Sequence, residues 1–185
     1  MNNDLLYHER ITSNKTEALF LGLTILFFGL LCSRVKDGDL DALAVVFFLF
    51  FGVFLFYSVN YRTLTIRITS EALMLTFGIF TWTVAVGNIE TCALDDVPIF
   101  MRMGGAGIHF MMIRKRYRAS FNFLEYPRVV IAFKRKAGPV RDISFSTRRP
   151  DDVLRILQET IAAKTTLQQE RSTDSGLSAL EIHQS

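Results

Sequence analysis

The run AVVFFLFFGVFLFYSV, residues 44–59, is the stretch that decides the fold of this chain. It contains no charged residue, and as a helix it has no polar face to turn toward water. Together with the two residues before it, the uncharged apolar run has 18 residues, and a bilayer core is crossed by roughly 17 to 25. The sequence therefore predicts a membrane-spanning helix here.

A second uncharged apolar run, residues 18–33, precedes this stretch and is joined to it by a short charged loop. Its 16 residues reach only about 24 Å as a helix, which is marginal for a full crossing. The flanking Lys15 and Arg34 extend its reach, because their charged ends can snorkel to the headgroups. We therefore expect a two-helix transmembrane hairpin over residues 16–60. The alternative is a buried helix pair in a soluble protein, which the apolar surface of the second run disfavours.

Two spans place both chain termini on the same side of a membrane. The near-membrane cations on that side are Arg10, Lys15, Arg62 and Arg67, and those in the loop are Arg34 and Lys36. The positive-inside tendency therefore places the termini and the larger domain in the cytoplasm. The N-terminal segment, residues 1–15, is expected to lie along the membrane interface or to be disordered. Two cysteines exclude a disulfide framework, which suits a reducing compartment.

Small residues fall on one face of the first predicted span, at Ala18, Gly22, Gly29 and Ser33. This small-xxx-small spacing lets a second helix approach closely. Packing against the second span of the same hairpin is the favoured interpretation. The other interpretation is association with a membrane protein partner or with another copy of the chain.

After the hairpin the hydrophobic period changes to two, as where Leu64, Ile66 and Ile68 alternate with polar residues. Short strands are predicted at residues 61–69, 72–77, 79–86, 110–113, 117–123, 129–133 and 140–146. Residues 89–94 are predicted to be a further strand or a helical turn leading into one. Pro150 suits a first helical position, and an amphipathic helix is predicted over residues 151–164. Residues 165–185 are polar and are expected to be disordered. The pattern predicts a membrane-anchored α+β chain whose small β-barrel or sandwich is capped by a C-terminal helix.

Three segments of the soluble part carry a resemblance to a known family: residues 66–94, residues 104–110 (GGAGIHF) and residues 129–157. They resemble bacterial PH-like (pleckstrin-homology-like) membrane proteins, in which one or two spans precede a PH-like domain. The resemblance implies a PH-like domain over residues 61–164 and a multi-pass protein of the inner (cytoplasmic) membrane. It implies no enzymatic activity, because PH-like folds serve lipid binding, peptide binding and scaffolding alike.

Positive charge dominates residues 114–149, which contain eleven basic residues and only two acidic ones, Glu125 and Asp142. The two densest clusters are Arg114, Lys115, Arg116 and Arg118, and Lys134, Arg135 and Lys136. If these clusters are neighbours they form one patch, and each cation near an anionic leaflet contributes about 1 kcal/mol. Contact with anionic lipid headgroups is the first expectation for this patch. The other two interpretations are a merely solvated basic face and contact with an acidic partner protein.

No arrangement of residues in the sequence predicts a catalytic, metal-binding or cofactor-binding site. His8 and His183 lie in or near the predicted terminal tails, and His109 follows the glycine stretch without a nearby cysteine or carboxylate, so no metal site is expected. The glycines of residues 104–107 do not form G-x-G-x-x-G, so no cofactor is expected, and no motif predicts nucleic-acid binding. The sequence predicts a non-enzymatic, membrane-tethered binding or scaffold module. The alternative is a structural subunit or assembly factor of a larger membrane complex.

Overall fold

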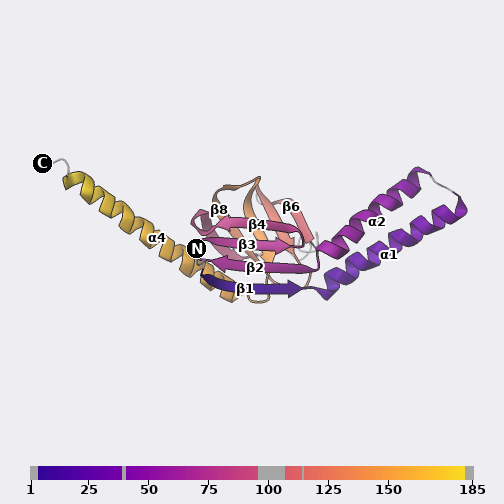
Figure 1. Cartoon of the computed structure of the whole chain (residues 1–185), viewed down its shortest axis with the longest axis horizontal. Helices are drawn as coiled ribbons and strands as arrows, with labels where there is room; N and C mark the ends of the chain where they lie inside the picture. Colours follow the sequence, from indigo (N-terminus) through magenta and orange to yellow (C-terminus); the bar gives the residue numbers. More distant parts are fainter. Residues whose placement is uncertain (1–3, 39–40, 96–106, 114, 182–185) are drawn as a thin grey trace.

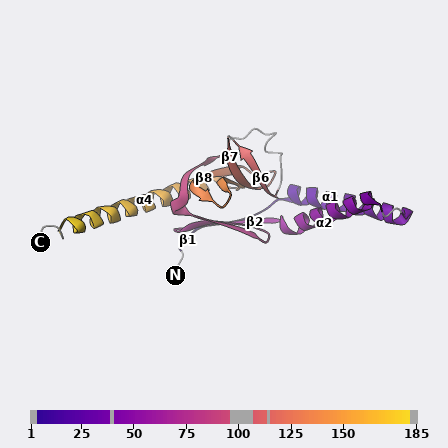
Figure 2. The same cartoon turned by 90° about the horizontal axis from the view of Figure 1, so that it is seen from above.

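The structure, a computed structural model, describes residues 4–38, 41–95, 107–113 and 115–181. It has three parts in a row (Figure 1): a helical hairpin, a β domain and a long C-terminal helix. The hairpin consists of α1 (Asn14–Asp37) and α2 (Ala42–Asn60). It projects from one end of the β domain, and the C-terminal helix projects from the opposite end in both views (Figure 2).

Local signals set the ends of the hairpin helices. The Ser13 hydroxyl accepts a hydrogen bond from the Thr16 amide at 3.1 Å and begins α1. Gly38, at φ 79°, ends α1 in the left-handed conformation that glycine tolerates. The Asp41 carboxylate begins α2 by accepting from the Ala44 amide at 3.0 Å. Both helices are long and apolar enough to span a membrane, and only 11 % and 6 % of their apolar stretches are buried.

The two hairpin helices meet through aromatic side chains. Phe27 of α1 stacks on Phe50 and Phe54 of α2, with ring centroids 5.0 and 5.4 Å apart. The predicted packing residues on the other face of α1 are Ala18, Gly22, Gly29 and Ser33, and all four are exposed. No atom lies within 4 Å of where a Cβ would stand at Gly22 or Gly29. The favoured packing of these residues on α2 is therefore wrong, because the bulky Phe27 face takes that contact instead.

The first sheet has the antiparallel order β1-β2-β3-β4. Its strands are β1 (Leu5–Thr12), β2 (Thr63–Thr69), β3 (Ala72–Phe77) and β4 (Phe80–Ala85). β1 precedes the hairpin in sequence and pairs with β2 after it, so the hairpin is inserted between two neighbouring strands. The expectation that the N-terminal segment lies along a membrane or is disordered is therefore wrong for β1. The charged residue Glu9 occupies an inward position between Tyr7 and Ile11. Its charge interrupts the alternation of apolar and polar residues by which a strand is recognised in a sequence.

The second sheet has the order β5-β8-β9-β7-β6, with β7 and β9 parallel. Its strands are β5 (Ile89–Leu94), β6 (Gly107–Ile113), β7 (Arg116–Asn122), β8 (Arg128–Ala137) and β9 (Val140–Ser146), and a short 3-10 turn, η1 (Val86–Asn88), leads into it. The sheets form two layers (Figure 2) with phenylalanines between them. Phe77 meets Phe121 and Phe123 at centroid distances of 6.5 and 5.1 Å. The domain is thus a two-sheet sandwich, and the closed-barrel alternative is not observed.

The first turns of the C-terminal helix α4 (Pro150–Glu181) pack on the sandwich, where Val153 and Leu157 are fully buried in the core. The helix continues to Glu181, although disorder was predicted from residue 165. No proline follows Pro150, and the leucine, glutamine, glutamate and alanine residues of this stretch favour helix. Residues 182–185 lie outside the described residues.

Candidate functional site

The two predicted basic clusters lie at the same end of the second sheet. The parallel pairing of β7 with β9 aligns Arg118 with Asp142, and the antiparallel pairing of β8 with β9 aligns Asp142 with Ala132. One end of the sheet is therefore formed by the start of β7, the start of β9 and the end of β8. The Arg116 guanidinium reaches the backbone oxygen of Arg141 on the neighbouring strand at 3.5 Å.

An asparagine side chain holds the second cluster in place. The Asn88 amide nitrogen donates to the Arg135 carbonyl, and the Arg135 amide donates to the Asn88 side-chain oxygen, both at 2.9 Å. These paired hydrogen bonds imitate those of a neighbouring strand. They hold the backbone of Arg135, the middle one of three exposed cations, Lys134, Arg135 and Lys136.

We call five exposed cations the basic end: Lys115, Lys134, Arg135, Lys136 and Arg141. Across the described ranges, no acidic side chain forms an ion pair with any of these five. Arg141 was not among the predicted site residues, and it is the strand pairing that brings it to this end of the sheet. Arg114, which was among them, lies outside the described residues.

Arg118, also a predicted contact residue, points into the domain. Its Nη1 lies 2.8 Å from Asp95 Oδ1, its Nη2 lies 3.8 Å from Asp142 Oδ2, and its side chain is 9 % exposed. Arg116 is intermediate between the exposed cations and the buried Arg118. Its Nε lies 2.8 Å from Asp142 Oδ1, and its side chain is 37 % exposed. Both guanidinium groups are thus engaged by carboxylates. Arg118 is not positioned to bind an external anion.

A small pocket of about 190 Å³ lies beside these ion pairs. It is lined by Thr91, Ala93, Ile113, Arg116, Arg118, Val130, Ala132 and Asp142. Because carboxylates already compensate its two arginines, the pocket offers little attraction to an anion.

Further polar side chains are buried on the same face of the second sheet. Ser120 and Ser144 share a hydrogen bond of 2.5 Å, and the Asn122 amide lies 3.5 Å from His109 Nε2. Burial, and then the charge of Arg128, lower the pKa of His109 below its ordinary value. Over the part of the chain that the structure describes, no three His, Cys, Asp or Glu side chains are grouped as metal ligands.

Arg135 of the basic end lies far from the hairpin. β4 begins at Phe80, whose ring is 6.4 Å from that of Phe56 in α2, and it ends at Ala85, just before the Asn88 that holds Arg135. Five strand residues advance about 17 Å at ~3.3 Å each, which is about twice the Debye length at physiological salt.

Comparisons with protein-family models, curated proteins and solved structures find no match to this chain.

Proposed function

We propose that the chain is a membrane-anchored binding module whose basic end recruits an acidic segment of a partner protein. In this proposal the hairpin spans the inner (cytoplasmic) membrane and a PH-like β sandwich stands in the cytoplasm. The observation that carries the proposal is the basic end itself: five exposed cations for which no ion-pair partner lies among the described residues, with the backbone of Arg135 held by Asn88. No reaction is assigned to the site.

Exposed apolar side chains support the membrane anchor. Ile25 of α1 and Phe48 of α2 are 63 % and 59 % exposed, so water would contact most of the hairpin surface. Burial of such surface in lipid is favourable by about 25 cal/mol per Å². The apolar surface continues onto the domain at the turn after β3, where Ile79 is 71 % exposed. Ile79 lies beside the end of α2 and would contact the bilayer interface in this orientation.

Geometry favours a protein over the chain's own membrane as ligand of the basic end. Strands β1–β4 run roughly along the direction in which the hairpin projects (Figure 1 and Figure 2), so their far ends point away from the bilayer. Charges two Debye lengths from a surface feel little of its potential. An acidic segment, by contrast, can approach the basic end freely, and its association would be steered by charge.

The sandwich layout supports the PH-like assignment, because two packed sheets are followed by a helix that covers one end of the core. The cytoplasmic orientation is supported by the larger number of near-membrane cations on the domain side. Arg62, two residues after the end of α2, is among them.

A binding assay with the full chain tests the proposal. The protein is placed in nanodiscs of neutral lipid, and a fluorescent glutamate-rich peptide serves as the probe. The triple variant Lys134→Ala/Arg135→Ala/Lys136→Ala is expected to bind roughly tenfold more weakly, and added salt is expected to abolish the difference. Arg67→Ala, which removes an exposed cation from β2, is the matched control. Equal affinities for the triple variant and the control would overturn the proposal.

A second candidate function is a structural subunit of a larger membrane complex. The small residues on α1 favour it, since Gly22 and Gly29 face away from α2 and are open to another helix. Gly22→Leu/Gly29→Leu is expected to lower the detergent-corrected mass of the particle in light scattering. Leu21→Ala/Leu30→Ala, changing neighbouring exposed positions, is the control. A wild-type particle with the mass of one chain would contradict this candidate.

A further inference from the structure

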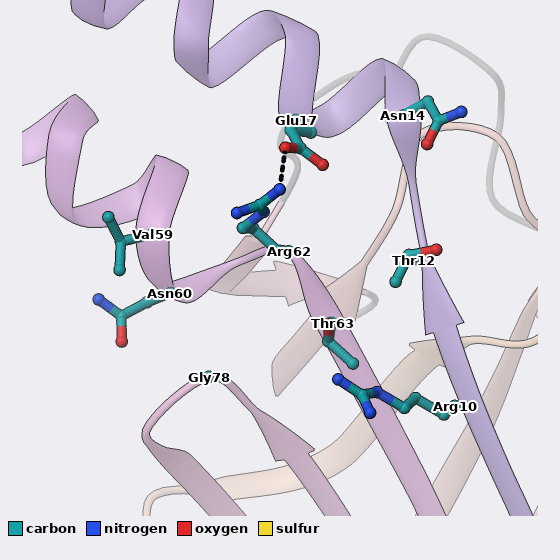
Figure 3. Close-up of a pocket in the computed structure, with 9 residues that line it drawn as sticks. All are labelled: Arg10, Thr12, Asn14, Glu17, Val59, Asn60, Arg62, Thr63 and Gly78. Carbon is teal, nitrogen blue, oxygen red and sulfur yellow. Dashed lines mark hydrogen bonds and ion pairs between the residues drawn. The ribbon is translucent and has the colours of Figure 1, made fainter.

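A polar pocket of about 470 Å³ lies where the hairpin joins the β domain (Figure 3). It is lined by Arg10, Thr12, Asn14, Glu17, Val59, Asn60, Arg62, Thr63 and Gly78. These residues come from the end of β1, the start of α1, the end of α2, the start of β2 and the turn after β3. Five chain segments therefore converge at the level where the apolar helices end, which is the headgroup level if the helices span a bilayer.

The charges in this pocket leave one cation uncompensated. Arg62 Nη2 lies 2.5 Å from Glu17 Oε1, so these two charges neutralise each other. Arg10 has no acidic partner among the residues that the structure describes, and its side chain reaches from β1 across β2 near Thr63 (Figure 3). The lining thus carries a net charge of about +1, which matches one phosphodiester group.

The remaining lining suits a phosphate with a hydrocarbon chain attached. The Thr12 and Thr63 hydroxyls and the Asn14 amide can donate hydrogen bonds to phosphate oxygens, and guanidinium groups bind phosphate in a bidentate manner. On the side toward the hairpin, Val59 is 66 % exposed and offers an apolar surface beside the pocket. A polar pocket with an apolar exit toward the spanning helices has the arrangement of a phospholipid site.

We propose that this junction pocket binds the phosphate headgroup of a membrane phospholipid, with Arg10 as its principal cation. Arg62 is a second donor and is positioned by Glu17. The proposal rests on the hairpin spanning a membrane, but it is independent of what the basic end binds. The same phosphate chemistry occurs in soluble phosphate esters, and the apolar side at Val59 favours the lipid.

Native mass spectrometry of the full chain, extracted in mild detergent, tests this inference. Phosphatidylglycerol is the lipid probe and glycerol 3-phosphate the soluble one. Arg10→Gln is expected to reduce phosphatidylglycerol binding roughly tenfold, because an uncharged amide replaces the bidentate guanidinium. Arg67→Gln, an exposed arginine on the same sheet but farther from the hairpin, is the matched control and is expected to leave binding unchanged. Glycerol 3-phosphate is expected to bind far more weakly than the lipid.

Three results would overturn the inference: equal lipid binding by Arg10→Gln and wild type, an equal loss in Arg67→Gln, or glycerol 3-phosphate binding as tightly as the lipid. Alkaline extraction of membranes containing the wild type or Arg10→Gln distinguishes a failure of the proposed membrane anchor from a failure of the lipid pocket. If both proteins stay in the membrane pellet, the anchor holds and a negative lipid result contradicts the pocket alone. If the wild type is released, the anchor itself is contradicted, together with the lipid site.

Discussion

Gly78, in the turn between β3 and β4, lies directly against the backbone carbonyl of Asn60, the last residue of α2. Its φ of 60° belongs to the left-handed region, and a Cβ added there would collide with the Asn60 carbonyl oxygen. This backbone contact holds the first sheet against the end of the hairpin. It therefore sets the direction in which the domain stands on the two helices.

Gly78→Ala is expected to destabilise the protein by about 1–3 kcal/mol, because the new methyl group must displace backbone and the left-handed conformation is strained for alanine. Thermal unfolding of the full chain in detergent measures the effect. Gly87→Ala is the control, since nothing lies within 4 Å of its Cβ position and its φ is not positive. Equal melting temperatures for the two variants would contradict the junction contact.

Asp142→Asn is expected to lower the free energy of unfolding by about 3 kcal/mol, because it removes a buried charge that two arginines share. Asp142 is 4 % exposed, and Arg116 and Arg118 would then depend on other carboxylates. Denaturant unfolding measures the loss. Glu159→Gln breaks an exposed helical pair with Arg155, and about 0.5 kcal/mol or less is expected there. Losses of similar size in both variants would contradict a structural role for Asp142.

Glu9→Gln is expected to loosen the attachment of β1 to the end of the second sheet. The Glu9 carboxylate accepts hydrogen bonds from the Thr147 hydroxyl at 2.6 Å and the Arg148 amide at 3.0 Å. It also accepts from the Tyr7 hydroxyl, and burial together with this carboxylate raises the pKa of Tyr7 to about 12. Hydrogen bonds to a charged group contribute about 1.5–3 kcal/mol. Faster hydrogen exchange in β1, with β8 unchanged, is the expected readout, and unchanged exchange in β1 would contradict it.

His109 is expected to make stability depend on pH. Burial lowers its pKa in the folded protein, whereas in the unfolded chain it takes up a proton near its ordinary value of 6.5. The unfolded state therefore binds more protons, and the free energy of unfolding falls as pH decreases through 6.5 toward the folded pKa. Chemical unfolding between about pH 7.5 and 5.5 measures this slope. His109→Gln should reduce the slope, and an unchanged slope in His109→Gln would contradict the assignment.

Local patterns predicted most of the fold after the hairpin. β3 (Ala72–Phe77), β5 (Ile89–Leu94) and β9 (Val140–Ser146) have the predicted bounds, because each is short and bounded by turn residues. Pro150 begins α4 as predicted. What the sequence could not supply was pairing between distant segments. β1 shows this, since its partner β2 lies beyond the whole hairpin and its inward Glu9 resembles a surface residue.

The same limit applies to the candidate site. The exposure of Lys134, Arg135 and Lys136 follows from a basic run after the buried Phe133. The burial of Arg118 does not follow from its neighbours in sequence, because its partner Asp95 follows β5 and its partner Asp142 lies on β9. Their pairing depends on the parallel contact of β7 with β9, which has no local signature.

The sidedness of the hairpin tests most directly whether its two helices span a membrane. In a Cys32→Ser/Cys92→Ser background, single cysteines replace the exposed Lys36, near the loop of the hairpin, or the exposed Glu71, on the β domain. A membrane-impermeant maleimide is then applied to intact spheroplasts of a bacterial expression host. If the hairpin spans the membrane with the β domain in the cytoplasm, Lys36→Cys is labelled at once and Glu71→Cys is labelled only after the membrane is permeabilised. Labelling of both positions, or of neither, in intact spheroplasts would contradict a hairpin that spans the membrane.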